Sequence, residues 1–140
     1  MALNEDYITI GQDIIGASFE VMKNAGRFMR ERYYEASLAY ELIQRGYDVK
    51  RQVTIPALYK GIQVEDSYIA DVVVDGRVII EIKAIPYMKD EEWRQLMSYL
   101  KLSGFKLGYL INFGAKDFSV GKSSEKSPYL KGIYRLVNNI

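Results

Sequence analysis

Two neighbouring segments of the chain, residues 68–74 and 77–83, are rich in β-branched residues and are separated by Asp75-Gly76. Asp-Gly between two such segments is a strong signal for a β-hairpin. Apolar residues occupy both alternating sets of positions in these segments, which is typical of strands covered on both faces. The sequence therefore predicts two paired central strands that lie between layers of helices.

Three ionisable residues, Asp71, Glu81 and Lys83, interrupt these apolar strands. Charged side chains are seldom buried unless they are paired or hold a metal ion. Side chains alternate along a strand, so Glu81 and Lys83 share one face of the sheet. The face on which Asp71 lies depends on the length of the hairpin loop.

A two-residue loop at Asp75-Gly76 would pair Val74 with Arg77 and would turn Asp71 to the face opposite Glu81. A three-residue loop with a left-handed Gly76, or an equivalent bulge, would bring Asp71, Glu81 and Lys83 to one face. We predict a loop with an odd number of residues, or an equivalent bulge. Two carboxylates and an ammonium group arranged in this way can hold Mg²⁺ and stabilise a phosphorane-like transition state.

The composition excludes several kinds of active site. Among the 140 residues there is no cysteine and no histidine. Disulfides, thiolate or histidine zinc sites, a Ser-His-Asp triad and a histidine general base are therefore ruled out. Catalysis must use carboxylates, lysine, tyrosine, hydroxyl groups or a metal ion held by oxygen ligands.

The length of the chain predicts one domain over residues 1–140. The net charge is only +1, but acidic residues concentrate in 61–92, between more basic stretches at 23–60 and 93–140. This pattern fits either a metal site beside a phosphate-binding surface or an ordinary mixed surface. The N-terminus is acidic where a signal peptide needs basic residues, and no apolar run approaches the roughly 20 residues of a membrane span. We therefore expect a cytoplasmic protein without membrane contact.

The remaining segments predict helices on both sides of the sheet. Apolar spacing favours helices over 7–24, 27–45 and 89–103, which end at Gly26, Gly46 and Gly104. Residues 47–59 read as extended chain, and residues 107–113 read as a buried strand. Residues 114–130 are predicted to form a long loop, followed by an edge strand over 132–137. The order of these elements is typical of the α/β or the α+β class, with one sheet and helices packed on it. We expect α/β, with a central mixed sheet flanked by helices.

Asp71 followed by Glu81-Ile82-Lys83 resembles the D…(D/E)xK signature of the PD-(D/E)xK nuclease superfamily, with Ala70 in place of its proline. Gln95 and Tyr99 match the QxxxY motif of its exonuclease branch. The chain more closely resembles the GxxExxY family of bacterial and archaeal proteins within that superfamily. The supporting segments are 14–17, 31–35, 59–61, 70–71, 81–84, 95–100 and 110–113. Phe28 stands where the motif has glycine.

The resemblance implies a restriction-endonuclease-like three-layer core and a Mg²⁺- or Mn²⁺-dependent nuclease that acts on nucleic acid, DNA rather than RNA. Asp71 and Glu81 would bind the metal ion with the Ile82 carbonyl, and Lys83 would activate the attacking water and stabilise negative charge. Glu31 would be the helix carboxylate that completes the metal shell, with Glu35 as the competing candidate. Gln95 and Tyr99 would position the site or the nucleic-acid backbone. A homodimer is one expected way for so small a domain to gain specificity.

Each assignment has a structural alternative. Asp71 could be a buried acid paired with Lys83, and Glu31 or Glu35 could be a surface partner of a neighbouring arginine. Gln95 and Tyr99 form an ordinary helix pair in most proteins. The alternative function is a catalytically idle nuclease fold that serves as a nucleic-acid- or protein-binding module.

Overall fold

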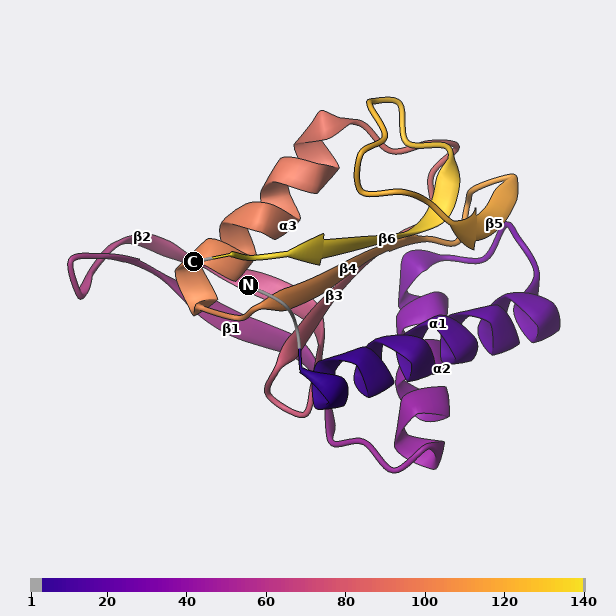
Figure 1. The fold of residues 1–140 in the computed structure, drawn as a ribbon, viewed down its shortest axis with the longest axis horizontal. Coiled ribbons are helices and arrows are strands. Elements are labelled where there is room, and N and C mark those ends of the chain that lie inside the picture. Colours follow the sequence, from indigo (N-terminus) through magenta and orange to yellow (C-terminus); the bar gives the residue numbers. More distant parts are fainter. Residues whose placement is uncertain (1–3, 140) are drawn as a thin grey trace.

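The computed structural model describes residues 4–139, so residues 1–3 of the acidic N-terminal segment and residue 140 of the expected domain lie outside it. Two helices come first along the described chain, and the strands of one sheet follow them (Figure 1). A third helix lies between the third and fourth strands in the sequence. The elements are α1 (Glu5–Ala25), α2 (Glu31–Gln44), β1 (Val49–Tyr59), β2 (Ile62–Val74), β3 (Val78–Lys83), α3 (Asp90–Ser103), β4 (Leu107–Asn112), β5 (Asp117–Val120) and β6 (Lys131–Val137).

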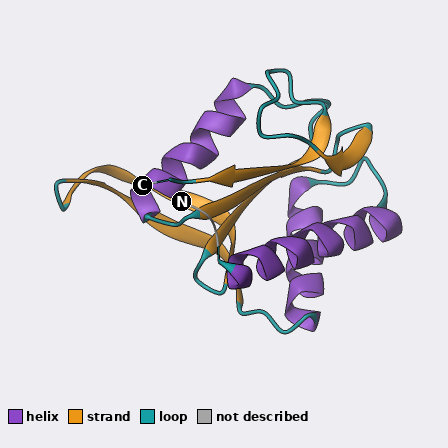
Figure 2. Ribbon diagram, in the orientation of Figure 1, coloured by secondary structure: helices purple, strands orange, loops and turns teal. Residues whose placement is uncertain are grey.

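Within residues 4–139 the sheet has six strands in the order β1-β2-β3-β4-β6-β5. The β3–β4 and β5–β6 pairs are parallel, whereas β1–β2, β2–β3 and β4–β6 are antiparallel. Helices α1 and α2 lie on one side of this mixed sheet and α3 lies on the other (Figure 2). The α/β, three-layer, restriction-endonuclease-like architecture expected from the sequence is confirmed.

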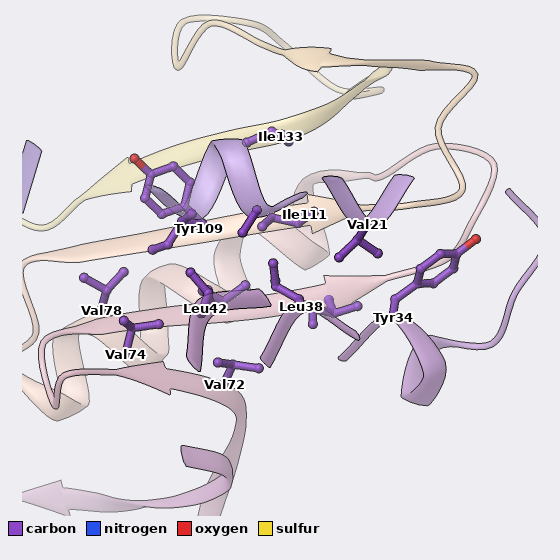
Figure 3. Packing of buried hydrophobic residues seen from close by; sticks show 14 of the residues in the cluster. Val21, Tyr34, Leu38, Leu42, Val72, Val74, Val78, Tyr109, Ile111 and Ile133 are labelled. Atoms are coloured by element: carbon purple, nitrogen blue, oxygen red, sulfur yellow. The ribbon is translucent and has the colours of Figure 1, made fainter. Parts of the chain in front are cut away.

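Each face of the sheet has its own apolar core, which explains why the central strands are apolar at successive positions. Val72, Val78 and Ile80 pack under α1 and α2, together with side chains such as Leu38 (Figure 3). The alternate residues Val73 and Ile79 pack against α3 on the opposite face. The two strands predicted to be central therefore lie between two helical layers.

The second helix starts later than the sequence predicts. It begins at Glu31 instead of residue 27, because Phe28 adopts the left-handed φ of 76° that a right-handed helix excludes. The buried Tyr34 hydroxyl stabilises this turn by donating to the Gly26 carbonyl at 2.6 Å and accepting the Met29 N–H at 3.1 Å. Residues 26–30 thus form an ordered loop before the helix.

Two further expectations for the C-terminal part are wrong. The predicted 114–130 loop contains β5, and this strand pairs in parallel with β6. Strand β6 therefore lies between β4 and β5 and is not an edge strand. The four-residue β5 has partly exposed residues and a register irregularity, so its sequence carries little of the pattern that marks a strand.

Strands β1 and β2 also continue beyond the rest of the sheet as a protruding hairpin, seen at the left of Figure 1. Lys60 and Gly61 form its turn, both with left-handed φ, of 50° and 78°. Positive φ at both central residues is the conformation of a tight type I′ turn. The sequence predicts extended chain at 47–59 but not the strand over residues 62–66 that pairs with it.

Candidate active site

The hairpin between β2 and β3 has a loop with an odd number of residues, as the sequence predicts. Val74 pairs with Val78, which leaves Asp75, Gly76 and Arg77 as a three-residue loop. Asp75 and Gly76 both adopt left-handed φ, of 53° and 62°, a conformation that Asp and Gly tolerate better than most residues. Continued along the strands, this register sets Asp71 opposite Glu81 and confirms the predicted loop.

The regular ladder between β2 and β3 stops at the pair Val72–Ile80, immediately before the two acids. Beyond that pair, the carboxylates replace main-chain acceptors. Asp71 Oδ2 accepts the Ile82 N–H at 2.8 Å, and Glu81 Oε1 accepts the Asp71 N–H at 3.2 Å. Each acid is therefore held by an amide at the opening between the strands, and the local backbone fixes the position of both carboxylates.

Glu81 carries an electrostatic cost in this position. Its side chain is almost fully buried, with 4% of the residue exposed. Burial, and then the nearby Asp71 carboxylate, raises the pKa of Glu81 to about 9, although the positive charge of Lys83 opposes the shift. At neutral pH the metal-free pair therefore retains a proton on Glu81. A cation bound between the two carboxylates would remove the cause of this cost.

The donor set fits a divalent cation such as Mg²⁺ or Mn²⁺. Asp71 and Glu81 supply carboxylate oxygens, the ligands that these hard cations prefer. In an extended strand the N–H and C=O of one residue face the same neighbour, so the Ile82 carbonyl faces the same opening as its N–H. Among the side chains that the structure describes, no group of three or more acidic, histidine or cysteine residues forms a metal cage. Such an ion would therefore keep water or substrate oxygens in its shell.

A second layer of contacts connects Asp71 to α2. Glu35 is buried, with 3% of the residue exposed, and accepts hydrogen bonds from Arg51 Nε at 2.8 Å and Gln52 Nε2 at 2.7 Å. Gln52 Nε2 also lies 3.4 Å from Asp71 Oδ1. The amide of Gln52 thus bridges Glu35 and Asp71. Its backbone has a left-handed φ of 52°, a strained conformation of the kind that concentrates at functional sites.

The structure separates the two carboxylates proposed for α2. Glu31 is the exposed first residue of the helix, and its side chain makes no hydrogen bond or ion pair with the residues that the structure describes. Glu35, one turn later, faces β1 and reaches Asp71 through Gln52. The helix therefore brings Glu35 toward the carboxylate pair and leaves Glu31 at the surface.

The two residues of the QxxxY pair are also placed differently. Tyr99 is buried on α3 and packs against the Tyr68 ring with centroids 4.8 Å apart. Burial and the nearby charges of Glu81 and Asp71 raise the pKa of Tyr99 to about 12, so its hydroxyl stays protonated and can donate a hydrogen bond. Gln95 is exposed.

Two polar residues at the site were not found from the sequence. Gln52 lies in a strand, and nothing in the period-two pattern of β1 indicates its left-handed backbone. Asn112 is fully buried at the end of β4, where its side chain bonds both the N–H and the C=O of Ile85 and also the Gly114 N–H. It fixes the segment that follows Lys83. A polar residue that ends an otherwise apolar strand was the only available signal.

Comparison with known proteins assigns the chain to a family. No helix among the described residues is long and apolar enough to cross a membrane. Neither the curated proteins nor the solved structures give a significant match to the chain. A family model described as the PD-(D/E)XK nuclease superfamily matches residues 9–123, a span that includes Asp71, Glu81 and Lys83. The chain therefore belongs to the PD-(D/E)XK nuclease superfamily.

Proposed function

We propose that this protein is a metal-dependent nuclease that hydrolyses phosphodiester bonds in nucleic acid, and that DNA is preferred to RNA. The observation that carries the proposal is the meeting of two carboxylates, the half-buried Asp71 and the buried Glu81, where β2 and β3 separate, with Lys83 two residues further along β3. Membership of the nuclease superfamily supports the same chemistry.

Asp71, Glu81 and the Ile82 carbonyl would hold Mg²⁺ or Mn²⁺. When bound, such an ion would polarise the scissile phosphate and favour the attack of water on phosphorus. The backbone amides that bond each carboxylate hold these oxygens in place before substrate arrives. This arrangement lowers the cost of organising the site during the reaction.

Lys83 and Tyr99 would act directly on the substrate. The Lys83 ammonium lies on the same side of β3 as Glu81, where it would orient the attacking water and stabilise the negative charge that develops on the phosphate oxygens. The protonated Tyr99 hydroxyl would donate to the nucleic-acid backbone. Gln95, exposed on the same helix, would meet only the outer part of a bound strand.

Glu35 and Gln52 would be positioning residues. The Gln52 amide donates to Glu35 at 2.7 Å and faces Asp71, so it fixes the orientation of the Asp71 carboxylate. Between the two acids of α2, the contacts favour Glu35 over Glu31 as the helix carboxylate that supports the site.

The test is a cleavage assay with Mg²⁺ or Mn²⁺ on single-stranded, duplex and branched DNA and on RNA of matched sequence. Asp71→Asn, Glu81→Gln and Lys83→Ala should each reduce cleavage by about 100-fold or more, the range typical for loss of a group that stabilises the transition state. Lys23→Ala, at the exposed end of α1, removes the same charge elsewhere and should leave the rate unchanged.

Two results would reject the proposal. One is the absence of cleavage of every substrate by the pure wild-type protein, which would leave an idle nuclease fold as the better description. The other is cleavage that survives Asp71→Asn and Glu81→Gln, which would assign the activity to a contaminant or to another site.

We further propose that the chain belongs to the GxxExxY group of this superfamily. Phe28 stands at the glycine of that motif, and its left-handed φ of 76° is the conformation that glycine favours. The single domain, the homodimer and the cytoplasmic location stay predictions. Gel filtration coupled to light scattering tests the homodimer directly.

A further inference from the structure

The most exposed large apolar side chain of the described residues is Phe28, of which 88% is open to solvent. Its backbone is left-handed, with φ of 76°, and residues other than glycine are strained in this region of backbone conformation. Position 28 thus combines the free-energy cost of an exposed aromatic ring with the free-energy cost of an unfavourable backbone conformation. Neither cost is offset by packing of the ring in the protein core.

The loop that carries Phe28 is held in one conformation. Tyr34 bonds both sides of the loop through its hydroxyl, to the Gly26 carbonyl and the Met29 N–H, while its ring stacks on Phe113 at 4.4 Å. Arg27 donates from Nη2 to the Gly114 carbonyl at 3.2 Å, and its guanidinium lies 4.7 Å from the centre of the Phe28 ring. The ring is therefore presented to solvent by a rigid support.

This loop borders the candidate active site. A notch of about 130 Å³ separates Phe28 and Arg27 from Ala84 and Ile85, the residues that directly follow Lys83. The notch is smaller than the roughly 300 Å³ of a typical small-molecule pocket, so it favours contact with part of a polymer. Tyr34, which holds the loop, is followed directly by Glu35 of the site.

The charge around the loop indicates the kind of polymer. Arg27, Arg30 and Arg32 lie within six residues of one another, and Glu31 is the one acid among residues 26–32. Arginine beside an exposed aromatic ring is the pattern by which proteins hold single-stranded nucleic acid, since the cation binds phosphate and the ring stacks on a base. A blunt duplex offers no free base face to such a ring except at its ends.

We propose that Phe28 stacks on an unpaired base of the substrate, and that the protein therefore acts on single-stranded DNA or on duplex DNA with an unpaired segment. This inference rests on the proposed nuclease function and adds its substrate class. Phe28 binds the base, Arg30 and Arg32 contact the adjoining phosphates, and the strand continues past Ala84 to Lys83.

The test measures binding by fluorescence anisotropy with a labelled 12-nucleotide single strand and a blunt duplex of the same sequence, in Ca²⁺ and separately in EDTA. Stacking on one base corresponds to an affinity change of about 5- to 150-fold. Phe28→Ala and Phe28→Gly should weaken single-strand binding by that factor and change duplex binding less than about twofold. Phe28→Trp should retain single-strand binding.

The melting temperature provides a readout that a structural role would not reproduce. Phe28→Gly removes the left-handed strain, so its melting temperature should equal or exceed that of the wild type while its affinity falls. Tyr59→Ala is the matched control, because Tyr59 is 62% exposed with Lys60 over its ring but lies at the hairpin tip. It should bind the single strand as the wild type does.

Several results would overturn the inference: wild-type protein that binds no single strand, unchanged affinity in Phe28→Ala, equal loss for the duplex, or equal loss in Tyr59→Ala. Cleavage is scored separately with Mg²⁺ or Mn²⁺. Phe28-dependent binding without cleavage would reject the nuclease function and keep the stacking site. Cleavage that needs Asp71 and Glu81 but not Phe28 would keep the nuclease function and reject the stacking site.

Discussion

The main-chain N–H of Asp71 donates to the Glu81 carboxylate at 3.2 Å across the opening between β2 and β3. The Asp71 carboxylate in turn accepts the Ile82 N–H of the opposite strand at 2.8 Å. Two acids are thus fixed close together by the backbone, and among the side chains that the structure describes no third carboxylate and no cationic group bonds directly to them. The pair is organised for a ligand and is electrostatically unfavourable without one.

The first prediction concerns the stability of the metal-free protein. The pKa of Glu81 is about 9 when folded, against an ordinary 4.5, so the folded state binds a proton that the unfolded state releases. The free energy of unfolding should therefore fall as pH rises from about 4.5 to 9. Glu81→Gln keeps an acceptor for the Asp71 N–H and should raise stability by roughly 2–3 kcal/mol at pH 7, with little change at pH 4.5.

Urea denaturation in EDTA at several pH values measures this effect. Glu20→Gln, an exposed carboxylate on α1, should leave the pH dependence as it is in the wild type. A loss of stability in Glu81→Gln at every pH would show instead that Glu81 serves mainly as the ion-pair partner of Lys83.

The second prediction concerns metal binding. A divalent cation must displace the proton from Glu81, so its affinity should rise by up to about tenfold per pH unit between pH 6 and 8, and about one proton should be released. Calorimetry with Mn²⁺ in buffers of different ionisation enthalpy measures both quantities. At ten times the dissociation constant, Mn²⁺ should stabilise the fold by about 1.4 kcal/mol.

Asp71→Asn should lose this binding and Glu20→Gln should retain it. Mn²⁺ affinity that is the same at pH 6 and pH 8, or that survives Asp71→Asn, would place the ion elsewhere on the protein.

The sequence predicted the centre of this site better than its surroundings. The Asp75-Gly76 signal predicted the hairpin and left the parity of its loop open. The odd parity that brings Asp71 to Glu81 followed from the cost of burying charges, and the register confirms it. The support from β1 did not follow, because the left-handed Gln52 is a tertiary constraint that no local propensity encodes. The identity of the helix carboxylate depended on where α2 begins.

The start of α2 shows the same limit at the level of the fold. Residues 27–30 have side chains compatible with a helix, yet the Tyr34 hydroxyl bonds the backbone of this segment and holds it as a loop. Strand β5 is formed by pairing with β6 rather than by its own four residues. Long periodic segments were therefore predicted correctly, and short segments whose conformation depends on distant contacts were not.

The third prediction separates Glu35 from Glu31. Glu35→Gln should weaken Mn²⁺ binding or cleavage by about tenfold, as expected for a residue that orients a metal ligand through a hydrogen bond. Glu31→Gln, an identical change one turn earlier, should alter both by less than twofold. Gln52→Ala should reproduce the effect of Glu35→Gln, and the double variant should add little. Equal effects of the two glutamate variants would reject the bridge through Gln52.

The fourth prediction tests whether the segment after Lys83 has to be held for the site to function. Asn112→Ala removes three hydrogen bonds and leaves Ile85 and Gly114 with unpartnered backbone groups, a change that should cost about 2–4 kcal/mol. Asn138→Ala is a matched control, because Asn138 is also buried and bonds the carbonyls of Leu100 and Phe105 at the far end of α3.

Both asparagine variants should therefore unfold at lower urea concentration. Only Asn112→Ala should also lower cleavage and Mn²⁺ affinity when each protein is assayed at a temperature where it is fully folded, because Asn112 fixes the chain that leaves Lys83. Asn112→Asp keeps the acceptor for the two N–H groups and should fall between wild type and Asn112→Ala. If Asn138→Ala reduces cleavage as strongly as Asn112→Ala does, then the loss follows from general destabilisation, and the hydrogen bonds from Asn112 to Ile85 have no specific part in the site.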